Sequence, residues 1–326
     1  MISKLTYKIL PYFIAFLLFG NISFFSQNFD NRDFVRPHLG SHAFVLNNSI
    51  VSPFINTFYS NSLGYGQSLN LNVPIIIIDG EPLTGLRGDV SFLNIDFGFQ
   101  NRVNSWTAIF IKAGVVARFG SEAQSIVAEG LNTTISAEIG WIFKVYETRN
   151  TILSFKTSLL NKSGTYLNLY KFVKEIVDSG GITDDNHLVY SGSFLQGTGA
   201  LLFGWSINKY FGFVTNLQVG YGESIDEISS TSLYYRATFS LDYDLSSAFP
   251  NIPLGFAIGY ISDSFSDSDD ISVKGSTNAI YYHIAYVGRK DLLLGVDIQY
   301  TLFPFISTTE DLKTVNASFN IKYYFN

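Results

Sequence analysis

The sequence predicts an all-β protein, a transmembrane antiparallel up-and-down β-barrel of about 12 strands with one or two short helices in its extracellular loops. Three observations predict this fold class. Apolar and polar residues alternate along most of the chain, short and long connections alternate between these stretches, and the first residues have the composition of a secretion signal.

The alternation begins after about Phe54 and continues to the C-terminus in stretches of about ten residues, the length of a strand that crosses a membrane at a tilt. A soluble β-sandwich would also alternate, but its polar face meets bulk water and should carry many Lys and Glu residues. Here the polar face is rich in Gly, Ser and Asn, which favours a membrane barrel. A typical stretch sets Leu93, Ile95, Phe97 and Phe99 against Asn94, Asp96, Gly98 and Gln100.

The connections are predicted to be short and long in turn, as barrels place tight turns at the periplasm and longer loops outside. The short turns are expected near 103–105, 147–150, 208–209, 246–253 and 288–291. The long loops are expected at 74–85, 120–132, 162–193, 222–232, 263–276 and 304–313. Two of these loops contain helical spacing, at 122–130 and 166–177. An even number of strands returns both ends of the chain to one side.

Three segments are predicted along the chain: a signal peptide at 1–27, an N-terminal segment at 28–53 that is periplasmic or plugs the lumen, and the barrel at 54–326. Lys4 and Lys8 precede the apolar run 9–20, which is shorter than the roughly 20 residues that a spanning helix needs. This run therefore favours a cleaved signal over a membrane anchor.

The composition narrows the possible partners. Aromatic residues make up 16% and charged residues 15% of the chain, against roughly 25% charged in a soluble domain. This balance suits a wall between lipid and water, so the lipid bilayer is the expected partner. The net charge of −6 argues against nucleic acid. The chain has no cysteine, which excludes disulfides and thiolate metal sites.

The signal sequence, the alternating stretches and the ending Tyr323, Tyr324 and Phe325 give the chain its likeness to known proteins. It resembles the bacterial outer-membrane β-barrel superfamily, with a composition similar to that of barrels from the Bacteroidota. By analogy with long-chain fatty acid transporters, residues 28–53 would form a plug. The resemblance implies an outer-membrane location with both termini periplasmic. It also implies recognition of the last strand by the barrel assembly machinery through Val315, Phe319, Tyr323 and Phe325.

Charged residues at polar positions of the alternation are the candidate functional residues, because those positions face the lumen. Such a set can pair across a narrow barrel and close it, since buried charges need partners. It can also line a path that selects solutes by charge. The predicted lumen-lining residues are Asp96, Lys112, Arg118, Glu138, Lys144, Lys156, Arg236, Asp242, Asp244, His283, Asp297 and Lys322.

No catalytic set, cofactor or metal site is predicted. His38 and His42 are four residues apart, but Pro37 and Gly40 disfavour a helix, so solvated periplasmic or plug side chains are expected. The acidic run 263–270 has oxygen ligands that calcium could use, yet its spacing fits no calcium loop, and a solvated outer loop is expected. His283 has no sequence motif for a Ser nucleophile beside it.

Three functions are consistent with these features. The leading one is a channel or transporter for small solutes or a hydrophobic ligand. The alternative is a closed structural or interaction barrel in an envelope secretion or adhesion assembly, with an unidentified envelope protein as its partner. An outer-membrane hydrolase would need a Ser or Asp close to His283 at the rim of the barrel.

Overall fold

The computed structural model describes residues 36–69, 71–78, 81–88, 90–120, 130–167, 189–223, 231–265, 276–303 and 312–325. The predicted signal peptide lies outside these residues. Val35–Phe325 form one compact unit.

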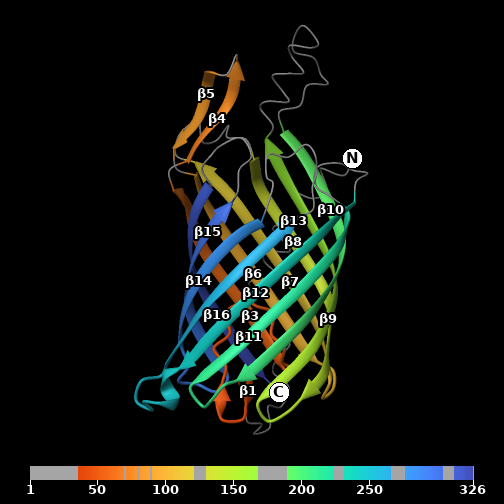
Figure 1. The fold of residues 1–326 in the computed structure, drawn as a ribbon, viewed down its shortest axis with the longest axis vertical. Coiled ribbons are helices and arrows are strands. Elements are labelled where there is room, and N and C mark those ends of the chain that lie inside the picture. Colours follow the sequence, from red (N-terminus) through yellow and green to blue (C-terminus); the bar gives the residue numbers. More distant parts are fainter. Residues whose placement is uncertain are drawn as a thin grey trace, which may run out of the picture. The chain divides into compact units, whose positions relative to one another are not determined.

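Twelve of the described strands form a closed antiparallel barrel, which confirms the predicted fold class (Figure 1). Neighbours in sequence pair with each other, β16 pairs with β3 to close the barrel, and Phe325 lies opposite Thr57. The order round the barrel is β10-β11-β12-β13-β14-β15-β16-β3-β6-β7-β8-β9. The strands are β3 (Thr57–Leu69), β6 (Val90–Arg102), β7 (Thr107–Gly120), β8 (Gly130–Glu147), β9 (Thr151–Leu167), β10 (Val189–Ser206), β11 (Phe211–Glu223), β12 (Thr231–Asp244), β13 (Leu254–Phe265), β14 (Ser276–Tyr286), β15 (Leu292–Phe303) and β16 (Leu312–Phe325).

Five short turns join strand pairs at one end of the barrel, close to the positions predicted for them. Two of these turns share one device. Asn104 Oδ1 accepts hydrogen bonds from the backbone N–H groups of Trp106 and Thr107, and Asn208 Oδ1 accepts them from those of Tyr210 and Phe211. An Asn side chain that satisfies two backbone donors in this way stabilises a tight turn. The β12–β13 turn contains the short 3₁₀ helix η1 (Leu245–Ser247).

Some predicted loops are in fact strand. Tyr166, predicted to begin a helix, pairs with Tyr190 between β9 and β10. The predicted loop 74–85 falls within a separate two-stranded sheet of β4 (Leu71–Ile78) and β5 (Glu81–Gly88), since the run of isoleucines at 75–78 is a strong strand former. Leu167 of the predicted helix 166–177 and Gly130 of the predicted helix 122–130 are strand residues as well, and they pair with each other between β8 and β9. Residues 122–129 and 168–177 lie outside the described residues. No helix in the described ranges is long and apolar enough to cross a membrane.

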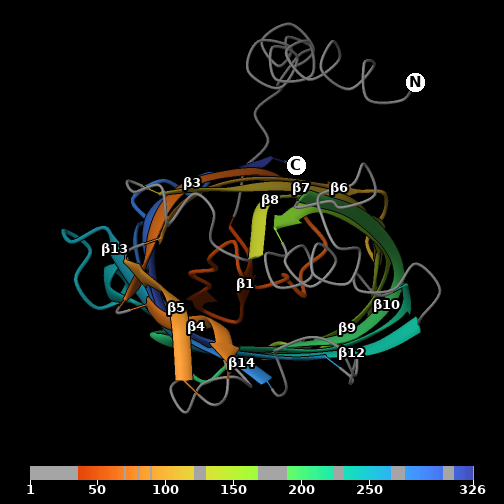
Figure 2. The same cartoon turned by 90° about the horizontal axis from the view of Figure 1, so that it is seen from above.

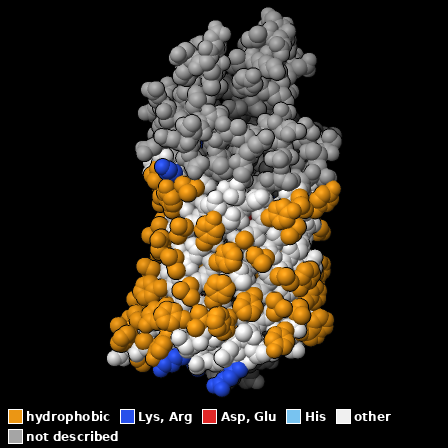
Figure 3. Space-filling model, in the orientation of Figure 1, with side chains coloured by type: hydrophobic (Ala, Val, Ile, Leu, Met, Phe, Trp, Pro, Cys, Tyr) orange, Lys and Arg blue, Asp and Glu red, His pale blue; other side chains and the backbone are white. Residues whose placement is uncertain are grey.

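The outward face of the barrel is apolar. Leu63, Leu159 and Phe319 are about half exposed, at 55%, 52% and 49%, as are many Ile, Leu and Tyr side chains in the same alternating register. Figure 3 shows hydrophobic side chains spread over the barrel wall that it presents, with Lys and Arg side chains only near its lower and upper ends. Such a belt around a closed barrel is what lipid contact requires.

Residues 36–56, here called the inner segment, lie inside the ring of strands (Figure 2). The segment starts with a hairpin of β1 (His38–Leu39) and β2 (His42–Ala43), turned by Gly40 at a φ of +58°. It then continues without regular structure, and Phe44 and Val45 are fully buried. Apolar side chains here pack against the inward face of the wall, as in the cluster of Phe44 with Phe54, Ile152 and Val214.

Candidate functional site in the barrel lumen

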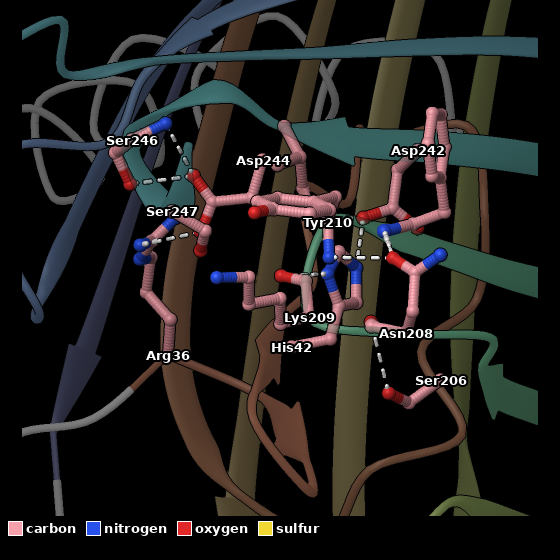
Figure 4. Close-up of polar contacts among 12 residues, drawn as sticks. Arg36, His42, Ser206, Asn208, Lys209, Tyr210, Asp242, Asp244, Ser246 and Ser247 are labelled. Atoms are coloured by element: carbon pink, nitrogen blue, oxygen red, sulfur yellow. Dashed lines mark hydrogen bonds and ion pairs between the residues drawn. The ribbon is translucent and has the colours of Figure 1, made fainter. Parts of the chain in front are cut away.

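The inner segment is held to the barrel wall by a buried hydrogen bond between His42 and Asp242 of β12 (Figure 4). His42 Nε2 donates to Asp242 Oδ2 over 2.8 Å, and both side chains are almost fully buried. The backbone N–H of Val45 donates to the same oxygen over 3.0 Å. The sequence placed His42 among solvated periplasmic or plug side chains. The prediction of a solvated side chain is wrong for His42, because its imidazole is fully buried and hydrogen bonds to a carboxylate 200 positions away.

Arg36 joins the start of the inner segment to the short-turn end of the barrel. Its backbone N–H donates to Lys290 O over 2.7 Å, and its guanidinium lies 4.0 Å from Asp244 Oδ2. Burial lowers the pKa of Arg36, and the nearby Asp244 carboxylate opposes this shift. Asp244 also accepts hydrogen bonds from Ser246 and Ser247, so it caps the β12–β13 turn as well (Figure 4).

Further hydrogen bonds attach the inner segment to three other strands. Lys322 of β16 is 3% exposed, and its Nζ donates to the carbonyls of Leu46 and Asn47 over 3.3 Å each. Ser154 of β9 donates to Pro53 O over 2.6 Å. Gln100 of β6 donates to Phe54 O over 2.8 Å. With Asp242 on β12, the segment is therefore anchored at four places around the wall.

Two inward-facing glycines make room for the inner segment. A Cβ added at Gly212 would lie 2.4 Å from His42 Nε2, and one added at Gly255 would lie 2.6 Å from Val45 Cγ2. Neither distance is tolerable for a carbon atom, so the close approach of segment and wall depends on these glycines.

A cavity of about 440 Å³ occupies the lumen on the side of the inner segment away from the short turns. Asn48, Ser49 and Val51 of the inner segment contribute to its lining, and the barrel supplies mostly polar side chains. The charged residues that line it are Asp96, Lys112, Glu138, Lys156, Lys162, Arg236, Asp263 and Asp297.

Most of these charges have partners inside the cavity. Lys156 Nζ lies 2.6 Å from Glu138 Oε1, which also accepts a hydrogen bond from Ser158 Oγ. Arg236 Nε lies 3.5 Å from Asp263 Oδ1. The lining residues include as many acids as bases, so the lumen is charged without carrying a large net charge.

Ten of the twelve predicted lumen residues fall into three groups. Asp96, Lys112, Glu138, Lys156, Arg236 and Asp297 line the cavity. Asp242, Asp244 and Lys322 lie at the inner segment. His283 is fully buried and donates from Nδ1 to Asp297, which also accepts from Asn320.

Lys144 and Arg118 do not line the cavity. Lys144 pairs instead with Glu147 beside the β8–β9 turn, where a bulge follows it in the strand register. Two cavity residues were missed, Lys162 and Asp263, which were placed in loops. Both side chains keep the inward register of their strands, since Lys162 is in step with Lys156 and Asp263 with Ile261, but polar residues on both faces hide this register in the sequence.

Asp263, the first acidic residue of the run 263–270, is a strand residue whose carboxylate pairs with Arg236. It is therefore not free to serve as a loop ligand for calcium. Residues 266–270 lie outside the described part. No group of three or more His, Asp or Glu residues that could hold a metal ion occurs among the residues that the structure describes.

No protein-family model and no curated protein matches the sequence. Among solved structures, the chain is similar to the translocator domain of autotransporter NalP from Neisseria meningitidis. The TM-score is 0.50 with 10% identity, over 83% of this chain and 89% of that one. The chain has the fold of outer-membrane β-barrels. It also matches the TodX monoaromatic hydrocarbon channel deltaS2 mutant (TM-score 0.47, 10% identity, 83% and 91% coverage) and the NanC porin (0.46, 7%, 81% and 98%). At these identities the likeness concerns fold alone.

Proposed function

We propose that the protein is an outer-membrane channel for small polar solutes, closed at rest by the inner segment acting as a plug. The observation that carries the proposal is the cavity of about 440 Å³, lined by charged and amide side chains and bounded on one side by residues 48–51. Binding sites for small molecules commonly have volumes of roughly 300–1,000 Å³.

The chemistry of the cavity favours a polar solute over a hydrophobic ligand, the two classes that the sequence left open. An apolar ligand would have to cover the ion pairs Lys156–Glu138 and Arg236–Asp263 without replacing their contacts with water. Burying charges in this way is costly. A polar solute can hydrogen bond to them instead.

The way in which the inner segment is anchored supports a plug that moves as a unit. Besides apolar packing, it contacts β6, β9, β12 and β16 through hydrogen bonds and through the ion pair of Arg36 with Asp244, and none of these contacts is covalent. Each such bond contributes about 0.5–3 kcal/mol. A solute or a partner protein can therefore compensate for their loss.

The apolar outer face of the barrel supports a location in a membrane. In the proposed orientation the barrel lies in the outer membrane, with the short turns and both termini in the periplasm after removal of a signal peptide at 1–27. Val315, Phe319, Tyr323 and Phe325 share the outward register of β16, where the barrel assembly machinery would read them.

Single-channel conductance in planar lipid bilayers tests the proposal, with two variants beside the wild type. His42→Ala combined with Lys322→Met loosens the plug. Val45→Cys combined with Gly255→Cys locks it, because the Gly255 Cβ position lies within bonding reach of the Val45 side chain. We expect larger or more frequent steps from the loosened variant, and silence from the oxidised lock until reductant is added.

The opposite results have clear meanings. No steps from the loosened variant, with the barrel folded, would favour the closed structural or interaction barrel. An oxidised lock that conducts like the wild type would show that solutes pass without movement of the inner segment. The reduced double variant is the matched control, because Gly255→Cys alone would clash with the Val45 side chain.

A further inference from the structure

Lys112 of β7 lines the cavity but makes neither a hydrogen bond nor an ion pair within the described part of the chain. The other cavity lysines differ. Lys156 is paired with Glu138, and Lys162 also has a contact of its own. An ammonium group in a semi-enclosed lumen without a partner is unusual, because charged groups away from bulk water are normally paired.

The acids nearest to Lys112 are already occupied. Glu138, its partner in the strand register, accepts from Lys156 and from Ser158. Asp96 of β6 accepts from Ser62 over 3.2 Å and from Asn94 over 3.5 Å. Glu138 and Asp96 attract Lys112 electrostatically and Lys156 and Arg236 repel it, but neither acid forms a hydrogen bond or ion pair with it in the described structure. The surroundings of Lys112 therefore favour an added anion.

Amide groups of the same cavity also lack partners. Asn216 of β11 lines the cavity and is 1% exposed, yet its Oδ1 has no hydrogen-bond partner in the described structure. Asn94 and Asn316 also line the cavity, and the Oδ1 atom of each likewise has no hydrogen-bond partner in the described structure. A buried amide without a partner costs about 1–3 kcal/mol, which a ligand carrying hydroxyl or amino groups would recover.

We propose that the cavity binds a small carboxylate that also carries hydroxyl or amino groups. The carboxylate accepts from Lys112 Nζ, and the hydroxyl or amino groups donate to the unpartnered amides, chiefly Asn216. This inference deepens the proposed function by naming its solute class. It rests on that function for the ligand's passage, but its binding can be measured separately.

Gluconate and sorbitol are matched probes, because they carry the same chain of hydroxyl groups and differ only in the carboxylate. Acetate supplies the carboxylate without hydroxyls. The full mature protein in detergent micelles is titrated with each by ligand-observed NMR at low ionic strength. We expect wild-type protein to bind gluconate at least about tenfold more tightly than sorbitol or acetate.

Two variants separate the two contacts. Lys112→Gln should weaken gluconate binding by at least about tenfold and bring it near that of sorbitol. Asn216→Leu, which keeps the branched shape and the number of heavy atoms, should weaken gluconate severalfold and leave acetate unchanged. Lys313→Gln removes the same charge from an exposed position on the outward register of β16 and should have no effect. Gel mobility of the unheated protein checks that every variant forms a barrel.

Equal binding of gluconate and sorbitol by the wild type, or wild-type affinity in folded Lys112→Gln, would overturn the inference. Channel steps without preference for gluconate would overturn the proposed carboxylate site and leave the proposed channel function standing. Gluconate binding as expected, with no conductance even in the loosened variant, would support the carboxylate site and overturn the proposed channel function.

Discussion

His42 and Asp242 are 200 residues apart in the sequence, and a 2.8 Å hydrogen bond joins their side chains inside the barrel. One carboxylate oxygen thereby holds both the imidazole of His42 and the backbone of Val45. The second oxygen, Oδ1, is buried without a partner in the described structure. The buried Asp242 carboxylate therefore relies on the inner segment for hydrogen-bond donors, and this carboxylate in turn holds the segment in position.

Replacement of His42 by Ala should release the inner segment. Loss of a hydrogen-bond donor to the buried Asp242 carboxylate costs about 3 kcal/mol, the upper end of the range for an unsatisfied buried group. The chain has no cysteine, so Ser52→Cys, at a position that is 6% exposed, gives a single reporter in the segment. We expect maleimide to label this cysteine on the order of a hundredfold faster in the His42→Ala background.

The matched control is a double-mutant cycle. If the two side chains act as a pair, Asp242→Ala should add little to His42→Ala, and the coupling should be about 0.5–3 kcal/mol. Labelling rates that rise independently with each substitution would show that the segment is not held by this contact.

Replacement of Glu138 by Gln should lower stability and shift ion selectivity. Lys156 is 1% exposed, and this change removes its counter-charge. The expected loss is about 3–5 kcal/mol of unfolding free energy, with a reversal potential moved toward anions. Denaturant unfolding and bilayer recordings under a salt gradient measure the two effects.

Glu147→Gln is the matched control for this change. Its partner Lys144 and Glu147 itself are partly exposed beside a turn, so the loss should stay below about 1 kcal/mol and selectivity should not move. Equal changes in unfolding free energy and ion selectivity in the two variants would mean that the Lys156–Glu138 pair does not determine the stability or selectivity of the lumen.

The barrel itself could be predicted because its determinants are local. Alternation along a strand, as from Leu292 to Tyr300, reports which side chains face lipid, and Asn104 and Asn208 mark turns that need only their nearest neighbours. The prediction failed where lipid contact ends. Lys162 to Leu167 continue β9 without the apolar alternation, so this part of the strand was taken for a loop.

The site could be predicted only in part, because local patterns give the direction of a side chain but not its long-range partner. Register alone puts Lys112, Glu138 and Lys156 on the inward face, but nothing local says that Lys156 takes Glu138 and leaves Lys112 without a partner. The contact between His42 and Asp242 depends on closure of the whole barrel around the inner segment. Such long-range pairs leave no pattern in a single sequence.

Replacement of Gly212 by Ala should loosen the inner segment without breaking any hydrogen bond directly. The added methyl group would lie 2.4 Å from His42 Nε2 and 2.7 Å from Asp242 Oδ1, so one of these groups must move. We expect an intermediate rise in labelling of Ser52→Cys, smaller than that caused by His42→Ala. Overpacking of this kind costs typically about 1–3 kcal/mol.

Gly199→Ala on β10 is the control for this glycine, since its added methyl group would meet only the Phe155 ring, at ordinary contact distances of 3.7–3.8 Å. It should leave the labelling rate unchanged. A similar rise in both variants would point to a general loss of barrel stability.

The β14–β15 turn should contribute a pH-dependent part of stability through Asp291 and Arg289. Arg289 donates from Nε and Nη2 to the two carboxylate oxygens of Asp291, over 2.9 and 2.5 Å. These hydrogen bonds lower the pKa of Asp291 below its ordinary value of 3.8. A carboxyl group whose pKa is lower in the folded state stabilises the fold above its unfolded pKa and loses that contribution as the pH falls through the folded value.

Arg289→Gln should therefore lower stability near neutral pH, and its difference from the wild type should shrink below about pH 4 as Asp291 takes up its proton. Unfolding curves in detergent at a series of pH values measure the difference. Lys290→Gln removes a charge from the same turn and should show no such convergence. A gap between wild type and Arg289→Gln that stays constant through acid pH would mean that Arg289 acts by packing and not through the Asp291 charge.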